Sequence, residues 1–187
     1  MKRSKIEEGA MRLAAKLKKL DVDGLDISEY NKFYLKKHQA HLDYNLKING
    51  LILENALQQN SSITAICDYG AGTGLLGFLA QESWGCNVVY TDIYPSACKD
   101  LPVIAAALGL KLFRVVEGDI QTLNQLNLNN IDAIVSRDVI EHIYDLKSFF
   151  NSGYALNPNL VQVHNTAANV YNILRKKEFK KIHHNCE

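Results

Sequence analysis

Five short apolar runs separated by segments of helical length constrain this chain of 187 residues more than any other feature. Each run is apolar at nearly every position, as expected for the strands of a parallel sheet that helices cover on both faces. The segments between them are long enough for the crossover connections that parallel strands need. The pattern predicts an α/β fold, a doubly wound parallel sheet, with strands at residues 63–69, 87–92, 112–117, 131–136 and 160–164.

The part of the chain before the first predicted strand has a helical pattern instead. Apolar residues recur every three or four positions in residues 6–20 and again in residues 42–57, which predicts two amphipathic helices. Ser28 followed by Glu29 is a plausible start for a helix between them. Because we find no linker or internal repeat, we expect a helical cap of the same domain here.

Length and composition set further limits. The chain has the length of one domain, which we divide into the cap at residues 1–60 and the core at residues 61–187. No apolar stretch approaches the roughly 18 residues that span a bilayer, and the first 20 residues lack a secretory apolar core, so we expect a cytoplasmic protein without a membrane span. Acidic residues outnumber basic ones in residues 21–174, which argues against nucleic acid as a partner.

The sequence CDYGAGTGLLG joins the first predicted strand to the next helix. Gly70, Gly72 and Gly74 allow a sharp turn and a close approach to a ligand, because they carry no Cβ. Gly77 completes a GxGxxG pattern, so a dinucleotide-binding oxidoreductase stays an alternative. Asp68 lies just before the glycines and would repel a pyrophosphate, which favours a cationic ligand such as S-adenosylmethionine.

Two more acids follow the next two predicted strands. Asp92 ends the second strand, where a carboxylate can accept hydrogen bonds from both hydroxyls of a ribose. Asp119 follows the third strand and is placed to accept from an adenine amino group, with Ile93 and Ile120 available to pack on the ring. Each acid alone is equally well explained as a helix N-cap. Their occurrence at successive strand ends predicts a nucleoside site.

These motifs resemble a known family. DYGAGTG, Asp92, GDI at residues 118–120 and IDAIVSRDVIEHIYD at residues 131–145 closely resemble class I S-adenosylmethionine-dependent methyltransferases, over about residues 30–165. SRDVIEHIYD is similar to the fourth motif of the branch that includes ubiquinone-biosynthesis O-methyltransferases and small-RNA 3′-end methyltransferases. The resemblance implies the Rossmann-like class I methyltransferase fold and S-adenosylmethionine as cofactor. It implies that the cofactor-binding residues are Asp68, Tyr69, Gly70, Ala71, Gly72, Gly74, Asp92, Ile93, Asp119, Ile120 and Arg137.

The stretch after the fourth strand carries the candidate catalytic residues. We expect methyl transfer to an oxygen, less so a nitrogen, of a small-molecule or lipid-like acceptor, with His142 as the general base. Asp138 is expected near the sulfonium. If a helix begins at Asp138, then Asp138, Glu141 and His142 share one face, and the resemblance implies that they could hold a magnesium ion. We favour the alternative in which Glu141 and His142 orient the acceptor loop without metal, because an aspartate at the first position has a short reach.

Two expectations concern the edges of the site and of the sheet. Tyr30, Tyr34 and His38 of the cap are candidate pocket residues. A complete fold of this class has seven strands, whereas the pattern here ends with the fifth strand and a helical segment at residues 165–181. We therefore expect the C-terminal hairpin to be missing, and we favour a fragment of a longer protein over a sheet with a short alternative edge. The missing hairpin also motivates a second hypothesis for the function, an inactive cofactor-binding regulatory or scaffold domain.

Overall fold

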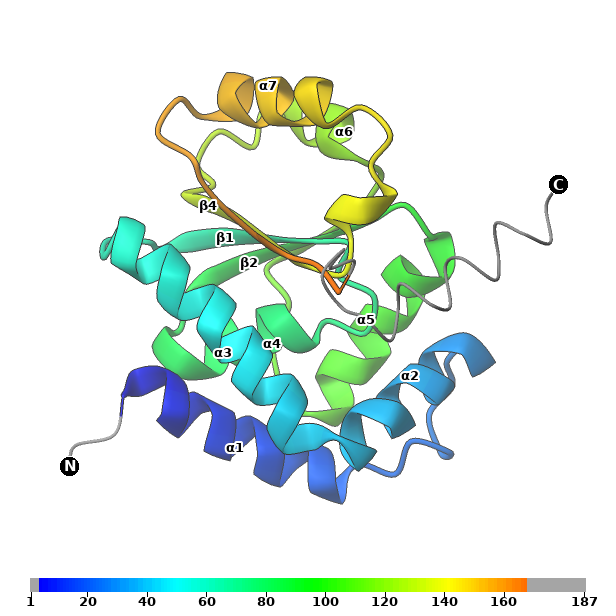
Figure 1. Cartoon of the computed structure of the whole chain (residues 1–187). Helices are drawn as coiled ribbons and strands as arrows, with labels where there is room; N and C mark the ends of the chain where they lie inside the picture. The colour runs from blue at the N-terminus through cyan, green and yellow to red at the C-terminus, as the bar shows by residue number, and fades with distance from the viewer. Residues whose placement is uncertain (1–3, 168–187) are drawn as a thin grey trace, which may run out of the picture.

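The structure is a computed structural model that describes residues 4–167, and a sheet of five parallel strands lies at its centre. The strands are β1 (Ala65–Tyr69), β2 (Asn87–Asp92), β3 (Arg114–Glu117), β4 (Ala133–Arg137) and β5 (Val161–Asn165). Their order across the sheet is β3-β2-β1-β4-β5, so the chain winds outward in both directions from β1 (Figure 1). The predicted doubly wound α/β sheet is confirmed, and the strand ends differ from the prediction by at most two residues.

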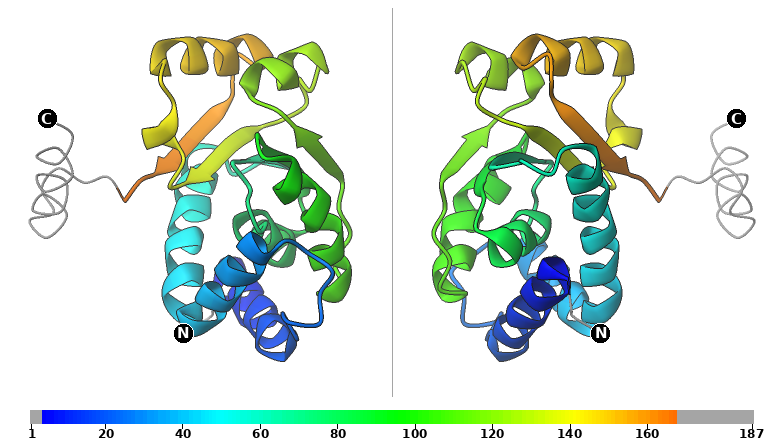
Figure 2. Two further views of the ribbon diagram at one scale, coloured as in Figure 1. Left: turned by 90° about the vertical axis from the view of Figure 1, so that its right-hand side faces the viewer. Right: turned by 90° about the vertical axis from the view of Figure 1, so that its left-hand side faces the viewer.

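Helices cover both faces of the sheet. The connections are α4 (Leu75–Trp84), α5 (Pro95–Ala107), α6 (Ile120–Gln125), a 3-10 helix η1 (Ile140–His142) and α7 (Leu146–Leu156). One face packs against α6 and α7, while the other packs against α4, α5 and the N-terminal helices. The side views show this division, with α7 in yellow and orange on one side and the blue and cyan helices on the other (Figure 2).

The N-terminal helices are α1 (Lys5–Lys19), α2 (Glu29–Ala40) and α3 (Leu42–Gln59). They agree with the predicted amphipathic segments, and the Ser28 hydroxyl caps α2 by accepting from the Asn31 backbone N–H at 3.3 Å. Helix α1 packs so closely on α4 that a Cβ added to Gly9 would lie 2.4 Å from the Ser83 Oγ. The division into a cap and a core at residue 60 stays a prediction.

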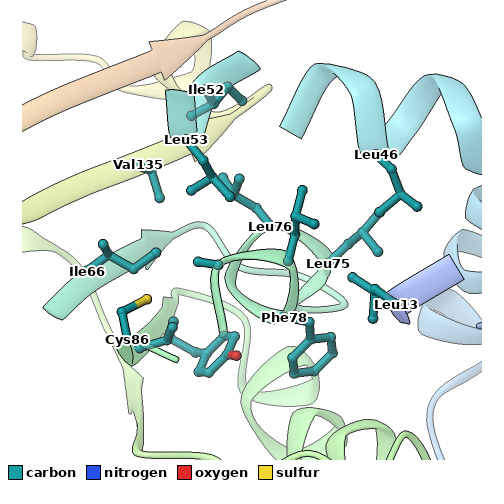
Figure 3. Packing of buried hydrophobic residues seen from close by; sticks show 14 of the residues in the cluster. Leu13, Leu46, Ile52, Leu53, Ile66, Leu75, Leu76, Phe78, Cys86 and Val135 are labelled. Atoms are coloured by element: carbon teal, nitrogen blue, oxygen red, sulfur yellow. The ribbon is translucent and has the colours of Figure 1, made fainter. Parts of the chain in front are cut away.

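The larger hydrophobic cluster joins these helices to the sheet. Leu13 of α1, Leu53 of α3 and Phe78 of α4 are almost fully buried and lie around one apolar space, with Ile66 of β1 and Val135 of β4 on the sheet side (Figure 3). Alternate residues of the same strands face the smaller cluster under α6 and α7. This alternation explains why each strand is apolar at nearly every position.

One predicted helix falls partly outside the described residues. The helix expected at residues 165–181 is not described from residue 168 onward, and Asn165 itself still belongs to β5. Within residues 4–167, the structure contains no helix that combines the length and apolarity needed to cross a bilayer.

Candidate functional site

A cavity of about 1250 Å³ lies at the carboxyl ends of β1, β2 and β4. Ligands of doubly wound sheets bind outside the strand ends, at the point where the strand order reverses, and here that point lies between β1 and β4. Common ligand pockets measure roughly 300–1,000 Å³. The cavity is therefore larger than a common pocket for one ligand. Its walls are the loop after β1, the loops after β2, β3 and β4, and the cap helices α2 and α3.

The glycine loop after β1 adopts backbone conformations that side chains disfavour. Gly70, Gly72 and Gly74 have φ of 70°, 52° and 79°. The N–H groups of Gly70 and Ala71 donate to the Thr91 carbonyl at 2.8 and 3.0 Å, which fixes the loop to β2. A Cβ on Gly70 would lie 2.4 Å from a Val139 methyl, whereas a Cβ on Gly72 would meet nothing within 4 Å. Gly72 thus leaves open space beside the cavity, as a closely approaching ligand requires.

The predicted ribose acid is held in one orientation by backbone donors. Asp92 is 6% exposed, and its Oδ2 accepts from the Gly72 N–H at 2.8 Å while its Oδ1 accepts from the Tyr94 N–H at 2.9 Å. Each carboxylate oxygen has two lone pairs, so each can take one more hydrogen bond. Asp92 therefore links the glycine loop to the end of β2 and still offers two acceptors to a ligand.

Asp68 is deeply buried, with 2% of its surface exposed. Its Oδ2 accepts from the Gly77 N–H at 2.8 Å, inside the first turn of α4. Burial raises the pKa of this carboxyl to about 7, the Gly77 hydrogen bond lowers it, and the charge of Asp92 raises it. A cationic ligand in the cavity would stabilise the ionised form, so the charge of Asp68 depends on what is bound.

The acid after β3 caps a helix and remains open on its other side. The Oδ1 of Asp119 accepts from the N–H groups of Gln121 and Thr122 at 3.0 and 3.1 Å, at the start of α6. Its Oδ2 is left for a ligand. Ile120 is buried, and its N–H donates to the Tyr69 hydroxyl at 3.2 Å. This bond ties the end of β1 to the start of α6.

The loop after β4 decides one condition that the sequence left open. Asp138 has a φ of 57°, outside any helix, and the helical turn nearby is η1 at residues 140–142. No helix begins at Asp138, so Asp138 does not share a helical face with Glu141 and His142. Within residues 4–167, no group of three His, Cys, Asp or Glu side chains is arranged to hold a metal ion.

The hydrogen bonds of Asp138 explain why its backbone is not helical. Its N–H donates to the Asn165 carbonyl at 2.8 Å, and its Oδ1 accepts from the Ala167 N–H at 2.9 Å. These bonds hold the loop to the end of β5 and compensate for a left-handed backbone. Aspartate tolerates that conformation better than most side chains do, and such strain is concentrated at functional sites.

Arg137 connects the end of β4 to the cap. Its Nη1 donates to the Asn49 Oδ1 at 3.2 Å and to the Asn45 carbonyl at 3.5 Å, and its guanidinium lies 5.9 Å from the ring centre of Tyr44. Asn45 and Asn49 are buried on the apolar side of α3 and were not among the predicted site residues. A polar residue repeated at a four-residue spacing within an apolar stripe is the signal that would have identified them.

Three histidines line the cavity, His38, His41 and His142, and the environments of His38 and His142 differ. His142 is exposed on η1. His38 of α2 is half-buried, and burial, followed by the charges of Arg137 and Lys37, lowers its pKa to about 4, so it is neutral near pH 7. His164 lies elsewhere, against the rings of Phe149 and Phe150 on the α7 side of the sheet.

The structure brings nearly all predicted site residues together. The predicted residues that line the cavity are Asp68, Tyr69, Gly70, Ala71, Gly72, Asp92, Ile93, Asp119, Ile120, Arg137, Asp138, Glu141 and His142, together with the cap residues Tyr30, Tyr34 and His38. Gly74 is not among the lining residues. It begins α4 in a left-handed conformation and packs against Leu101 and Phe78.

Comparison with known proteins gives a family match and several fold matches. Residues 60–186 match the family model described as a methyltransferase domain. The PH0226 protein of Pyrococcus horikoshii OT3 aligns with a TM-score of 0.54 and 18% identity, over 76% of this chain and 62% of that chain. Ribosomal protein L11 methylase from Lactobacillus delbrueckii subsp. bulgaricus aligns with a TM-score of 0.51 and 20% identity, over 72% of this chain and 66% of that one.

A third solved structure is a mutant of MtNAS in complex with S-adenosylmethionine, with a TM-score of 0.51 and 16% identity over 79% of this chain and 51% of that chain. The chain thus spans less than two thirds of the length of these three structures. A search of curated proteins finds no match. At these identities the likeness establishes the fold.

Proposed function

Because the chain belongs to the methyltransferase domain family, we propose that it binds S-adenosylmethionine and transfers a methyl group to an acceptor in the same cavity. The observation that carries this proposal is the contact between Asp92 and Gly72. This buried carboxylate is bonded to the loop glycine, lines the cavity and keeps lone pairs that can accept from ribose hydroxyls. When bound, S-adenosylmethionine supplies a methyl group that its sulfonium has already activated.

The donors and acceptors of the cavity fit this cofactor. Asp92 offers two acceptors for ribose hydroxyls, and Asp119 offers its Oδ2 for an adenine amino group. Ile93 supplies an exposed apolar side chain to the same cavity. Asp68 offers a carboxyl whose ionised form a cation favours. The dinucleotide alternative has less support, because a pyrophosphate would face the carboxyl group of Asp68.

For the acceptor we propose an oxygen, less so a nitrogen, of a small-molecule or lipid-like compound, as in the branch resembling ubiquinone-biosynthesis O-methyltransferases. The aromatic side chains of Tyr30, Tyr34 and Tyr44 on the cap wall support an acceptor with apolar surface. His142 takes the proton of the acceptor, and Asp138 lies near the sulfonium. Magnesium is not part of this proposal, because Asp138 does not join Glu141 and His142 on one helical face.

A cytoplasmic location belongs to the same proposal. Cys67, Cys86 and Cys98 are free thiols in the described part of the chain, which is typical of a reducing compartment.

The binding step is tested by isothermal titration of the full chain with S-adenosylhomocysteine. The Asp92→Ala variant should lose binding because both ribose acceptors are removed, while thermal unfolding shows that it stays folded. Asp26→Ala, an exposed acid that does not line the cavity, is the matched control. Unchanged affinity in Asp92→Ala would contradict the proposed site. Transfer of labelled methyl groups to phenolic and alcoholic acceptors then tests the reaction, and wild-type binding without any turnover would favour the regulatory alternative.

A further inference from the structure

Helix α2 carries two hydrogen-bonding atoms that lack a partner. In residues 4–167, the Oδ1 of Asn31 and the Nδ1 of His38 are the buried side-chain polar atoms without a hydrogen bond, and both residues line the cavity. They are seven residues apart, or about two helical turns, and therefore lie on the same face of the helix. A buried polar atom without a partner destabilises the protein, so its retention calls for an explanation.

Asn31 is the better defined of the two. Its side chain is 1% exposed, and its Nδ2 donates to the Asp100 Oδ2 at 2.8 Å. The same Oδ2 accepts from the backbone N–H and the hydroxyl of Ser28, at 3.0 and 2.5 Å. Asp100 thus fastens the first turn of α2 to α5. Because the bond to Asp100 uses the Nδ2, it fixes the amide and leaves the Oδ1 of Asn31 as its free acceptor.

The chain neighbours of Asn31 and Asp100 show where the first turn of α2 lies relative to the cavity. Tyr30, next to Asn31 in the chain, is within electrostatic range of Asp92 and Tyr94. Leu101, next to Asp100, packs against the glycine loop, since a Cβ on Gly74 would lie 2.6 Å from its methyl group. The first turn of α2 therefore lies where the glycine loop and the end of β2 meet.

We propose that the Oδ1 of Asn31 accepts a hydrogen bond from the bound S-adenosyl ligand, and that Asp100 is the positioning residue that fixes the amide for this contact. The donor is a ribose hydroxyl or the α-ammonium of the ligand, and both groups share the chemistry that a buried amide oxygen recognises. The inference rests on the proposed function for the identity of the ligand. It assigns a residue of the cap, outside the strand-end motifs, to ligand binding.

The test is titration of the full chain with two probes, S-adenosylhomocysteine and 5′-methylthioadenosine, which has the ribose and lacks the α-ammonium. Asn31→Leu should weaken binding of S-adenosylhomocysteine about tenfold or more, because the amide is replaced by an apolar group of similar size. Asn55→Leu is the matched control, since Asn55 is exposed on α3 and its Nδ2 donates to the Leu51 carbonyl of its own helix. This control should bind like the wild type.

The two probes distinguish the donors. An equal loss for both probes assigns the ribose hydroxyl, and a loss for S-adenosylhomocysteine alone assigns the α-ammonium. Asp100→Ala should produce a smaller loss of the same kind. Wild-type affinity of a folded Asn31→Leu variant for both probes would overturn the inference, whereas failure of the wild type to bind either probe would instead remove the proposed function on which it rests.

A measurement on the wild type covers the case in which Asn31→Leu does not fold. The side-chain amide of Asn31 can be observed by NMR in the labelled protein, and S-adenosylhomocysteine should shift its carbonyl carbon resonance as the oxygen gains a donor. An unchanged resonance at saturating ligand would overturn the inference. The Asn55 amide provides the reference signal.

Discussion

The buried carboxyl of Asp68 makes the stability of the protein depend on pH in a direction opposite to that of a salt-bridged acid. Burial raises its pKa from the ordinary 3.8 to about 7 in the folded chain. The folded state therefore retains a proton that the unfolded state has already released. The contribution of Asp68 to the free energy of unfolding is therefore fully present below pH 3.8, and it is lost as the pH rises through about 7.

The perturbation is Asp68→Asn, which keeps an oxygen to accept from the Gly77 N–H and removes the charge. The difference between a pKa of 3.8 and one of about 7 corresponds to about 4 kcal/mol, as an order of magnitude. At pH 4 the variant and the wild type should unfold with nearly the same free energy. At pH 8 the variant should be more stable by up to about 4 kcal/mol.

Urea unfolding at a series of pH values between 4 and 8 measures this difference. A difference in the free energy of unfolding between the variant and the wild type that increases with pH supports the reasoning. A difference that stays constant or decreases would refute it. Titration with S-adenosylmethionine, whose sulfonium carries a positive charge, adds a second measurement. If a cationic ligand stabilises ionised Asp68, then binding near pH 7 should release a proton, and the measured enthalpy should depend on the buffer. Asp68→Asn should lose that buffer dependence.

Two more substitutions address the glycine loop and the acceptor side. Gly72→Ala should cost about 1–2 kcal/mol of stability for its left-handed backbone, and Gly70→Ala should cost more, because its Cβ would also meet Val139. Urea unfolding checks this order, and equal losses would contradict it. His142→Ala should reduce the rate of methyl transfer far more than the affinity for S-adenosylhomocysteine. Kinetics with labelled methyl groups measure the rate, and isothermal titration measures the affinity. Equal losses of rate and affinity would indicate a structural role for His142.

The strands could be predicted because their burial follows from a repeated local pattern. In β1 every residue is buried, with Ile66 facing one cluster and Cys67 the other, so an apolar run is sufficient to identify the strand. The acids and glycines of the site could be predicted because strand ends and tight turns place them at one edge of the sheet. These features depend on residues close together in the sequence.

The loop after β4 could not be predicted in the same way. The stretch DVIEH has a helical pattern, yet the backbone of Asp138 is left-handed because its N–H and carboxylate bind Asn165 and Ala167, which follow more than 25 residues later. The Asp100 contact that orients Asn31 likewise joins residues 69 positions apart. Such contacts depend on the packing of α2 and β5 against the core, and no local pattern contains them.

The acids of the site also show why two interpretations from the sequence were not true alternatives. Asp119 was expected either to cap a helix or to bind a ligand, and its Oδ1 caps α6 while its Oδ2 stays available. Asp92 likewise accepts one backbone N–H on each oxygen and keeps lone pairs for a ligand. The hydrogen bonds that stabilise the loops therefore also orient the carboxylates. Removing either acid is expected to change stability and affinity together, so a loss of binding identifies a ligand contact only where unfolding is measured on the same variant.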